Sequence, residues 1–143
     1  MEIEFTPLKR SQVAEVSALL QSISAYSPDP AHFDSIWLRH SKQSNVFSIV
    51  AQQPDGRLLG LGTLLLEAKI RGGTVGHIED IVTHPDFRNL GIGQAVIEEL
   101  VKIAVVEGCY KVALHCKEHN VPFYEKSGFR SSGTAMQRLL LNH

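Results

Sequence analysis

The sequence predicts an α/β protein in which a mixed β-sheet carries helices on its faces. Short runs of alternating apolar residues recur along the chain, as is typical of strands, and between them apolar residues follow helical spacing. The expected order of elements is β-α-α-β-β-β-α-β-α-β. The 143 residues fit one domain, which we expect to span residues 1–143.

The first elements are a short strand and two helices. Ile3 and Phe5 alternate with charged residues, which indicates a strand. Residues 11–23 place apolar side chains at helical spacing. Pro28-Asp29-Pro30 interrupts this helix, and a second short helix is expected to carry three apolar side chains on one side: Phe33, Ile36 and Trp37.

Three strands follow, separated by turn sequences. Residues 46–51 and 58–66 are predicted to form a hairpin around the turn Pro54-Asp55-Gly56. Arg71-Gly72-Gly73 is a second turn and leads into a strand over residues 74–82.

The helix predicted over residues 92–106 has the clearest pattern in the chain. Gly108 ends it, and residues 110–116 alternate as a strand. A short helix is expected over residues 120–126 and a last strand over residues 134–141. The apolar stripe of the long helix consists of Ile92, Val96, Leu100 and Ala104, with Ile97 and Val101 beside it.

Composition excludes several classes of function. A net charge of −1 does not favour a broad nucleic-acid surface. No apolar run approaches the length of a membrane span and no signal peptide is evident, so we expect a cytoplasmic protein. Cys109 and Cys116 are expected to be small buried strand residues rather than a disulfide, and the scattered histidines predict no metal site.

The loop Arg88-Asn89-Leu90-Gly91-Ile92-Gly93 lies between a predicted strand and the long helix. The free amides at a helix start and the helix dipole together favour phosphate oxygens. Gly91 and Gly93 let the backbone approach a ligand closely, and Arg88 adds a charged contact. The loop therefore suggests a pyrophosphate ligand, although a tight strand-to-helix turn would also use these glycines.

This order of elements and the pattern Arg88-x-x-Gly91-x-Gly93 resemble the GNAT superfamily of acetyl-CoA-dependent N-acetyltransferases. Within it, the chain is most similar to the glucosamine-6-phosphate N-acetyltransferases. Three stretches carry this likeness, namely residues 76–82 (GHIEDIV), 108–112 (GCYKV) and 120–129 (NVPFYEKSGF).

The resemblance implies acetyl transfer from acetyl-CoA to the amine of glucosamine 6-phosphate by direct attack, as a step toward UDP-GlcNAc. It also implies a homodimer joined partly through the last strand, and no metal. Two alternatives stay open: the same chemistry on another small primary amine, and a non-catalytic acyl-CoA-binding module.

The resemblance also implies the residues that hold the cofactor. The backbone of the strand before the loop would pair with the pantetheine arm, and the short helix would add further contacts. The expected cofactor-binding residues are Ile81, Val82, Arg88, Asn89, Leu90, Gly91, Ile92, Gly93, Gln94, Asn120, Phe123 and Lys126.

Glu79 and Asp80 are implied to line the sugar site, where one of them helps to remove the amine proton, directly or through water. Strict alternation would place Asp80 on the same face as Ile78 and Val82, so we predict a β-bulge that redirects this carboxylate. The alternatives are a salt-bridged core acid at Asp80 and an exposed acidic pair next to Arg71 or to the loop arginine.

Tyr124 is expected to protonate the departing thiolate, because a phenol pKa of ~10 is close to that of a thiol. An aromatic packed on the sheet, with its hydroxyl bound to backbone, is the alternative. His115 stands where the resembled family has a carboxylate. It is a candidate base, a sign of a different amine, or a structural residue.

A sugar phosphate needs cations. Lys69 and Arg71 lie in the connection that holds the phosphate contact in the resembled family, but the connection is shorter here and lacks the histidine of that family. Arg138 lies close to where the family places an arginine that reaches into the partner subunit. These three residues are the expected phosphate-binding set.

Overall fold

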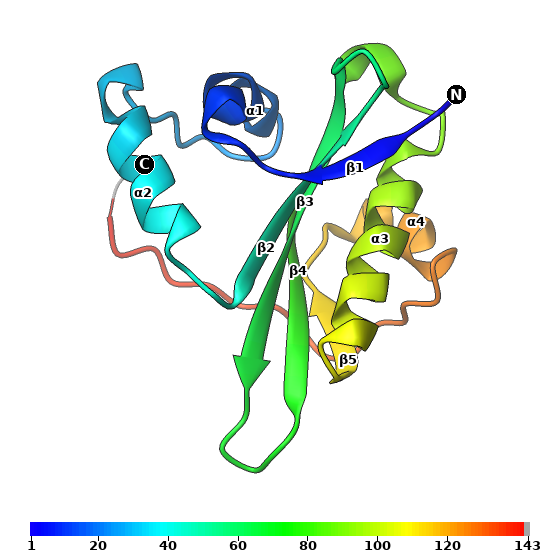
Figure 1. The fold of residues 1–143 in the computed structure, drawn as a ribbon. Coiled ribbons are helices and arrows are strands. Elements are labelled where there is room, and N and C mark those ends of the chain that lie inside the picture. The colour runs from blue at the N-terminus through cyan, green and yellow to red at the C-terminus, as the bar shows by residue number, and fades with distance from the viewer. Residues whose placement is uncertain (142–143) are drawn as a thin grey trace.

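The computed structural model describes residues 1–141, and its centre is a five-stranded mixed sheet (Figure 1). The strands lie in chain order. Each of the first four is antiparallel to the next within that group, and the fourth and fifth are parallel to each other. The mixed sheet is therefore confirmed. The strands are β1 (Glu4–Pro7), β2 (Val46–Gln52), β3 (Leu58–Ala68), β4 (Thr74–Thr83) and β5 (Cys109–Leu114).

Helices cover both faces of the sheet. In Figure 1, α1 (Val13–Leu20) and α2 (Phe33–Ser41) lie on one side, and α3 (Ile92–Val106) and α4 (Val121–Glu125) lie on the other. Short 3₁₀ turns precede α1, α2, α3 and α4. None of the helices within residues 1–141 is long and apolar enough to cross a membrane.

The core consists of two apolar layers, because successive side chains of a strand point to opposite faces. One layer packs α1 against the sheet through Val16, Val50 and Leu61. The other packs α3 against it, and four of its residues form the stripe predicted from the sequence: Ile92, Val96, Leu100 and Ala104.

Gly62 allows α3 to lie close to β3. A Cβ atom there would stand 2.5 Å from Val96 Cγ1, 2.8 Å from Ile81 Cδ1 and 2.9 Å from Leu100 Cδ1. All three are packed side chains of the α3 layer, so they would have to move. We expect Gly62→Ala to lower the free energy of unfolding by about 1–3 kcal/mol, measured by urea denaturation. Unchanged stability would mean that the helix shifts without loss.

The predicted last strand is wrong. Residues 134–141 form no strand and pair with no other segment of the described chain. A strand needs a neighbouring strand to take its backbone hydrogen bonds. The apolar pattern alone did not reveal that residues 1–141 contain no strand that pairs with this segment. The large apolar side chains of this segment are exposed: Met136, Leu139, Leu140 and Leu141.

Several other predicted boundaries moved, two of them by two or three residues in ways that affect the site. The first helix ends at Leu20 rather than at residue 23. β5 ends at Leu114, because its pairing with β4 stops at Ile78, directly before β4 changes direction. Cys116 consequently lies outside the strand and is exposed, so the expectation of a buried strand cysteine is wrong there. Cys109 is half-buried in β5.

Candidate active site

A β-bulge interrupts β4 at Asp80, as predicted. Leu61 of β3 faces Val82 and Thr63 faces Glu79, so the single residue between them on β3 opposes two residues on β4. The backbone of Asp80 has a φ of 56°, in the left-handed region. The bulge redirects this side chain away from the core, and Asp80 forms no ion pair within residues 1–141.

Asp80 lines a cleft of about 150 Å³ that lies between the sheet and helices α1 and α2. Much of the cleft wall is apolar, including Leu20 and Trp37. Desolvation raises the pKa of Asp80, and an electrostatic interaction with the nearby His40 opposes that rise. A carboxylate in this setting is a better proton acceptor than one in open water.

Glu79 is exposed and stands beside Asp80 at the bulge. Neither acid is paired with an arginine in the described chain. Arg71 instead donates a hydrogen bond to the Tyr110 hydroxyl at 3.1 Å, and Arg88 is exposed. Both acids are exposed, as in the alternative of an exposed acidic pair, but neither forms an ion pair with Arg71 or Arg88.

The loop before α3 has the geometry of an anion site. Gly91 is the N-cap of α3 and has a φ of 83°. In the first helical hydrogen bond, the Ala95 amide donates to the Gly91 carbonyl at 3.0 Å. The amides of the first helical turn thus have no acceptor within the helix. No side chain caps them and no acid lies in that turn. A Cβ at Gly91 would meet no atom within 4 Å, so the space in front is open.

An unpaired strand edge leads from the bulge toward this loop. β5 pairs with residues 74–78 of β4 only, so residues 79–83 have no neighbour on that side (Figure 1). Ile81 packs against the α3 layer, whereas the Val82 side chain is buried in the α1 layer. Only the backbone of Val82 is therefore available to an extended ligand at this edge.

Helix α4 brings Tyr124 to the same region. Phe123 packs against the start of α3, where its Cζ would stand 3.0 Å from a Cβ at Gly93. Tyr124 makes edge contacts with the rings of Phe123 and Phe129, at centroid distances of 5.0 and 6.1 Å. Burial raises the pKa of Tyr124, and the nearby Cys116 adds to the rise.

The Tyr124 hydroxyl has no hydrogen-bond partner among the described residues. The alternative in which this hydroxyl is bound to backbone is therefore not what the structure contains. The group remains available to a ligand.

Most of the other residues predicted to belong to the site are exposed. His115 follows β5 directly, is exposed, and forms no hydrogen bond or ion pair within residues 1–141. Asn120 is the exposed N-cap of α4, and Lys126 is exposed at the other end of that helix. Among the loop residues, Asn89 has a φ of 64° and is exposed, as is Leu90. Gln94 is half-buried in the first turn of α3.

The expected phosphate-binding cations are dispersed. Lys69 forms an ion pair with Glu67 at 2.8 Å, and the same carboxylate oxygen lies 2.8 Å from His77 Nε2. Arg71 lies on the same hairpin, held by its tyrosine partner. Arg138 is exposed in the irregular segment after α4. The single chain thus does not bring these three cations together.

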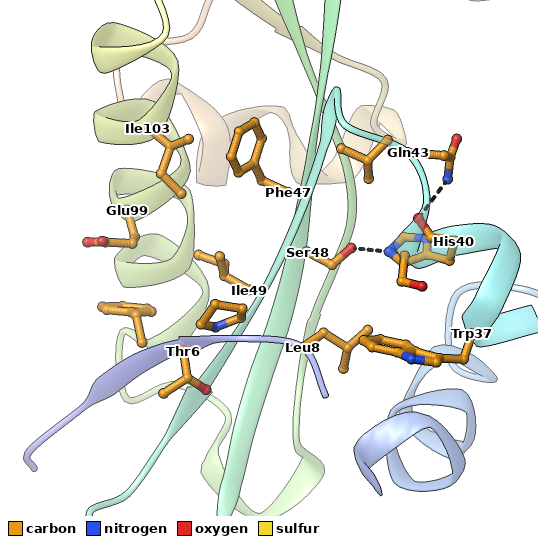
Figure 2. A pocket seen from close by; sticks show the side chains of 14 residues that line it. Thr6, Leu8, Trp37, His40, Gln43, Phe47, Ser48, Ile49, Glu99 and Ile103 are labelled. Carbon is orange, nitrogen blue, oxygen red and sulfur yellow. Dashed lines mark hydrogen bonds between the residues drawn. The ribbon is translucent and has the colours of Figure 1, made fainter. Parts of the chain in front are cut away.

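Sequence reasoning missed a polar cluster in the cleft that contains Asp80. His40 Nε2 lies 3.0 Å from Ser48 Oγ (Figure 2). The same Ser48 Oγ lies 2.7 Å from Thr63 Oγ1. These residues come from α2, β2 and β3 and are separated along the chain. The one available signal was Thr63, which interrupts the leucines of β3.

A larger cleft of about 410 Å³ lies at the outer edge of the sheet, along β2 (Figure 2). Phe47, Ile49 and Ile103 lie on one side of this strand, and Trp37 and His40 lie on the other. Neither the bulge nor the glycine loop borders this cleft. We therefore place the reacting groups at the smaller cleft. No group of three or more potential metal ligands occurs among residues 1–141.

Comparison with known proteins agrees with this geometry. Residues 15–129 match the model of the acetyltransferase (GNAT) family. Glucosamine 6-phosphate N-acetyltransferase of Trypanosoma brucei brucei is 35% identical over 140 residues, covering 96% of this chain and 95% of that protein. Its counterpart named glucosamine 6-phosphate N-acetyltransferase 1 in Dictyostelium discoideum is 37% identical over 139 residues, covering 94% and 88%.

A solved structure also has the same fold. The crystal structure of glucosamine-6-phosphate N-acetyltransferase from Arabidopsis thaliana superposes with a TM-score of 0.87 at 27% identity. The match covers 98% of this chain and 99% of that one.

Proposed function

This chain belongs to the GNAT family of acetyltransferases, and on that premise we propose that it transfers the acetyl group of acetyl-CoA to the amine of glucosamine 6-phosphate. The products are N-acetylglucosamine 6-phosphate and CoA. The observation that carries the proposal is the bulge at Asp80, which lies where the open edge of β4 meets the cleft. Relatives that cover nearly the whole chain bear the name of this activity.

Acetyl-CoA fits the residues present. Its diphosphate would bind the open first turn of α3, with Arg88 as a charged contact. Its pantetheine arm would extend along the unpaired edge of β4, as added strands do in peptide recognition. Asn120, Phe123 and Lys126 of the α4 region would complete the site. Bound there, acetyl-CoA supplies the thioester carbon that is attacked.

The chain's own groups handle two protons. Asp80 accepts a proton from the substrate ammonium, directly or through water, and Glu79 binds the sugar beside it. The freed amine forms the C–N bond as the C–S bond breaks, and Tyr124 donates its phenolic proton to the leaving sulfur. The nitrogen then loses its second proton to water to give the neutral amide, and a proton from water restores the phenol. His115, at the end of β5, is the alternative proton acceptor.

A second copy of the chain would complete the protein. We infer a cytoplasmic homodimer, in which the exposed leucines at positions 139–141 become covered. Such an arrangement would bring Arg138 toward the partner's cleft and add a cation to Lys69 and Arg71.

A thiol-release assay tests the substrate. Wild-type protein is expected to release CoA with glucosamine 6-phosphate, and kcat/KM is expected to fall at least about tenfold with unphosphorylated glucosamine, because each charged hydrogen bond contributes about 1.5–3 kcal/mol. Equal kcat/KM for both sugars would exclude a working phosphate site.

A panel of other small primary amines completes that assay. Another amine is the second candidate substrate class, because Glu67 already neutralises Lys69 and a histidine replaces the family carboxylate at position 115. Faster turnover with such an amine would favour it.

A further inference from the structure

We propose that His40, Ser48 and Thr63 form a hydroxyl-recognition row in the acceptor cleft, which selects amines that carry hydroxyl groups close to the reacting nitrogen. The inference rests on the proposed function and extends it to the residues that choose the acceptor. Its ligand class is a polyhydroxylated primary amine.

Strand register aligns the row. Ser48 of β2 stands opposite Thr63 of β3, and Thr63 stands opposite Glu79 of β4. Directly opposed residues of antiparallel strands share a face, so these three polar side chains form a line that ends next to the bulge. The adjacent line across the same strands is apolar and consists of Val50, Leu61 and Val82.

The hydrogen bonds within the row leave part of its hydrogen-bonding capacity available to a ligand. Ser48 Oγ interacts with both His40 Nε2 and Thr63 Oγ1. A hydroxyl group offers one donor and two acceptor positions, so Thr63, with one partner in the described chain, retains capacity for another hydrogen bond. His40 is only partly buried and anchors the far end from α2 (Figure 2).

The row and the catalytic acid border the same cleft, which is lined by Asp80, His40, Ser48 and Thr63. Desolvation raises the pKa of Asp80, and an electrostatic interaction with His40 in the same cleft opposes the rise. An amine held at the bulge would therefore present its neighbouring hydroxyl groups to Thr63. An amine without them would leave the remaining hydrogen-bonding position of Thr63 unfilled.

A mutant and substrate cycle tests the row. Wild-type and Thr63→Val proteins are assayed with glucosamine 6-phosphate and with its analogues lacking one ring hydroxyl. For at least one analogue, wild-type kcat/KM is expected to fall about tenfold, as for one lost hydrogen bond. Thr63→Val is expected to lose about tenfold on the full substrate and to show little further loss on that analogue.

Matched variants separate recognition from folding. Thr63→Ser keeps the hydroxyl and is expected to retain wild-type discrimination. His40→Phe removes the anchor and is expected to raise the KM for the sugar while leaving the KM for acetyl-CoA unchanged. His32→Phe is its control, because His32 is exposed at the opposite end of α2 and does not border the cleft.

Two outcomes would overturn the inference: wild-type kcat/KM in Thr63→Val, or an equal loss on every substrate with no coupling to a hydroxyl. Both differ from a failure of the proposed function, in which wild-type protein itself releases no CoA with glucosamine 6-phosphate. In that case the proposal that the ligand is a polyhydroxylated primary amine would also be rejected.

Discussion

Gly91→Asp is expected to abolish acetyl-CoA binding, with a Kd raised at least about 100-fold. Gly91 caps α3 with its first-turn amides open, and an aspartate at an N-cap accepts hydrogen bonds from those same amides. The introduced carboxylate would therefore occupy the anion site and repel the diphosphate. Calorimetric titration with acetyl-CoA measures the effect.

Gly91→Ala is the matched control. It shares the backbone cost of a side chain at a φ of 83°, about 1–2 kcal/mol, but it adds no charge and its Cβ meets no atom within 4 Å. We expect this variant to melt at a lower temperature and to lose less than about tenfold in affinity. Wild-type affinity in Gly91→Asp would show that the diphosphate does not bind at this helix start.

Tyr124→Phe is expected to lower kcat by about 100-fold and to leave the KM for acetyl-CoA nearly unchanged, as for loss of a general acid. Phenylalanine preserves the edge contacts with Phe123 and Phe129, so the packing of α4 is retained. The removed hydroxyl has no protein partner within residues 1–141, which confines the loss to the ligand. Steady-state kinetics with both substrates varied gives the two constants.

The raised pKa of Tyr124 also predicts how the activity depends on pH. Burial and Cys116 raise the pKa of Tyr124, and a general acid acts in its protonated form. Activity that depends on this group is thus present below its pKa, and it is lost only at a pH above the range in which an ordinary phenol titrates. Wild-type kcat should show no loss from this residue at neutral pH. A wild-type kcat in Tyr124→Phe would remove the phenol from the mechanism.

Local patterns were enough to predict much of the fold and part of the site. The apolar residues of α3 recur every four positions, and this spacing predicts which face of the helix is buried. Both the buried face and the two ends of the helix were confirmed. The bulge was predictable because Asp80 interrupts the apolar residues Ile78 and Val82 on one predicted face. The extra residue turns this carboxylate out of the core, while Ile78 and Val82 stay buried in opposite layers.

Contacts between distant segments were not predictable. His40 and Ser48 are 8 residues apart, and Ser48 and Thr63 are 15 apart, with no shared motif. They meet only because α2 folds over the sheet and strand register aligns the two hydroxyls. The strand predicted over residues 134–141 was wrong for a related reason. The apolar pattern of a segment does not show whether another strand is available to pair with it.

The left-handed backbone of Asp80 restricts which amino acids this position tolerates. Glycine, asparagine and aspartate accept that conformation readily, whereas alanine loses about 1–2 kcal/mol and β-branched residues lose more. Of the two common acids, the short one is therefore favoured at the irregularity, whereas Glu79 is not in the left-handed region. Asparagine is consequently the substitution that removes the charge without reshaping the strand, and an alanine scan at this position would report main-chain strain together with chemistry.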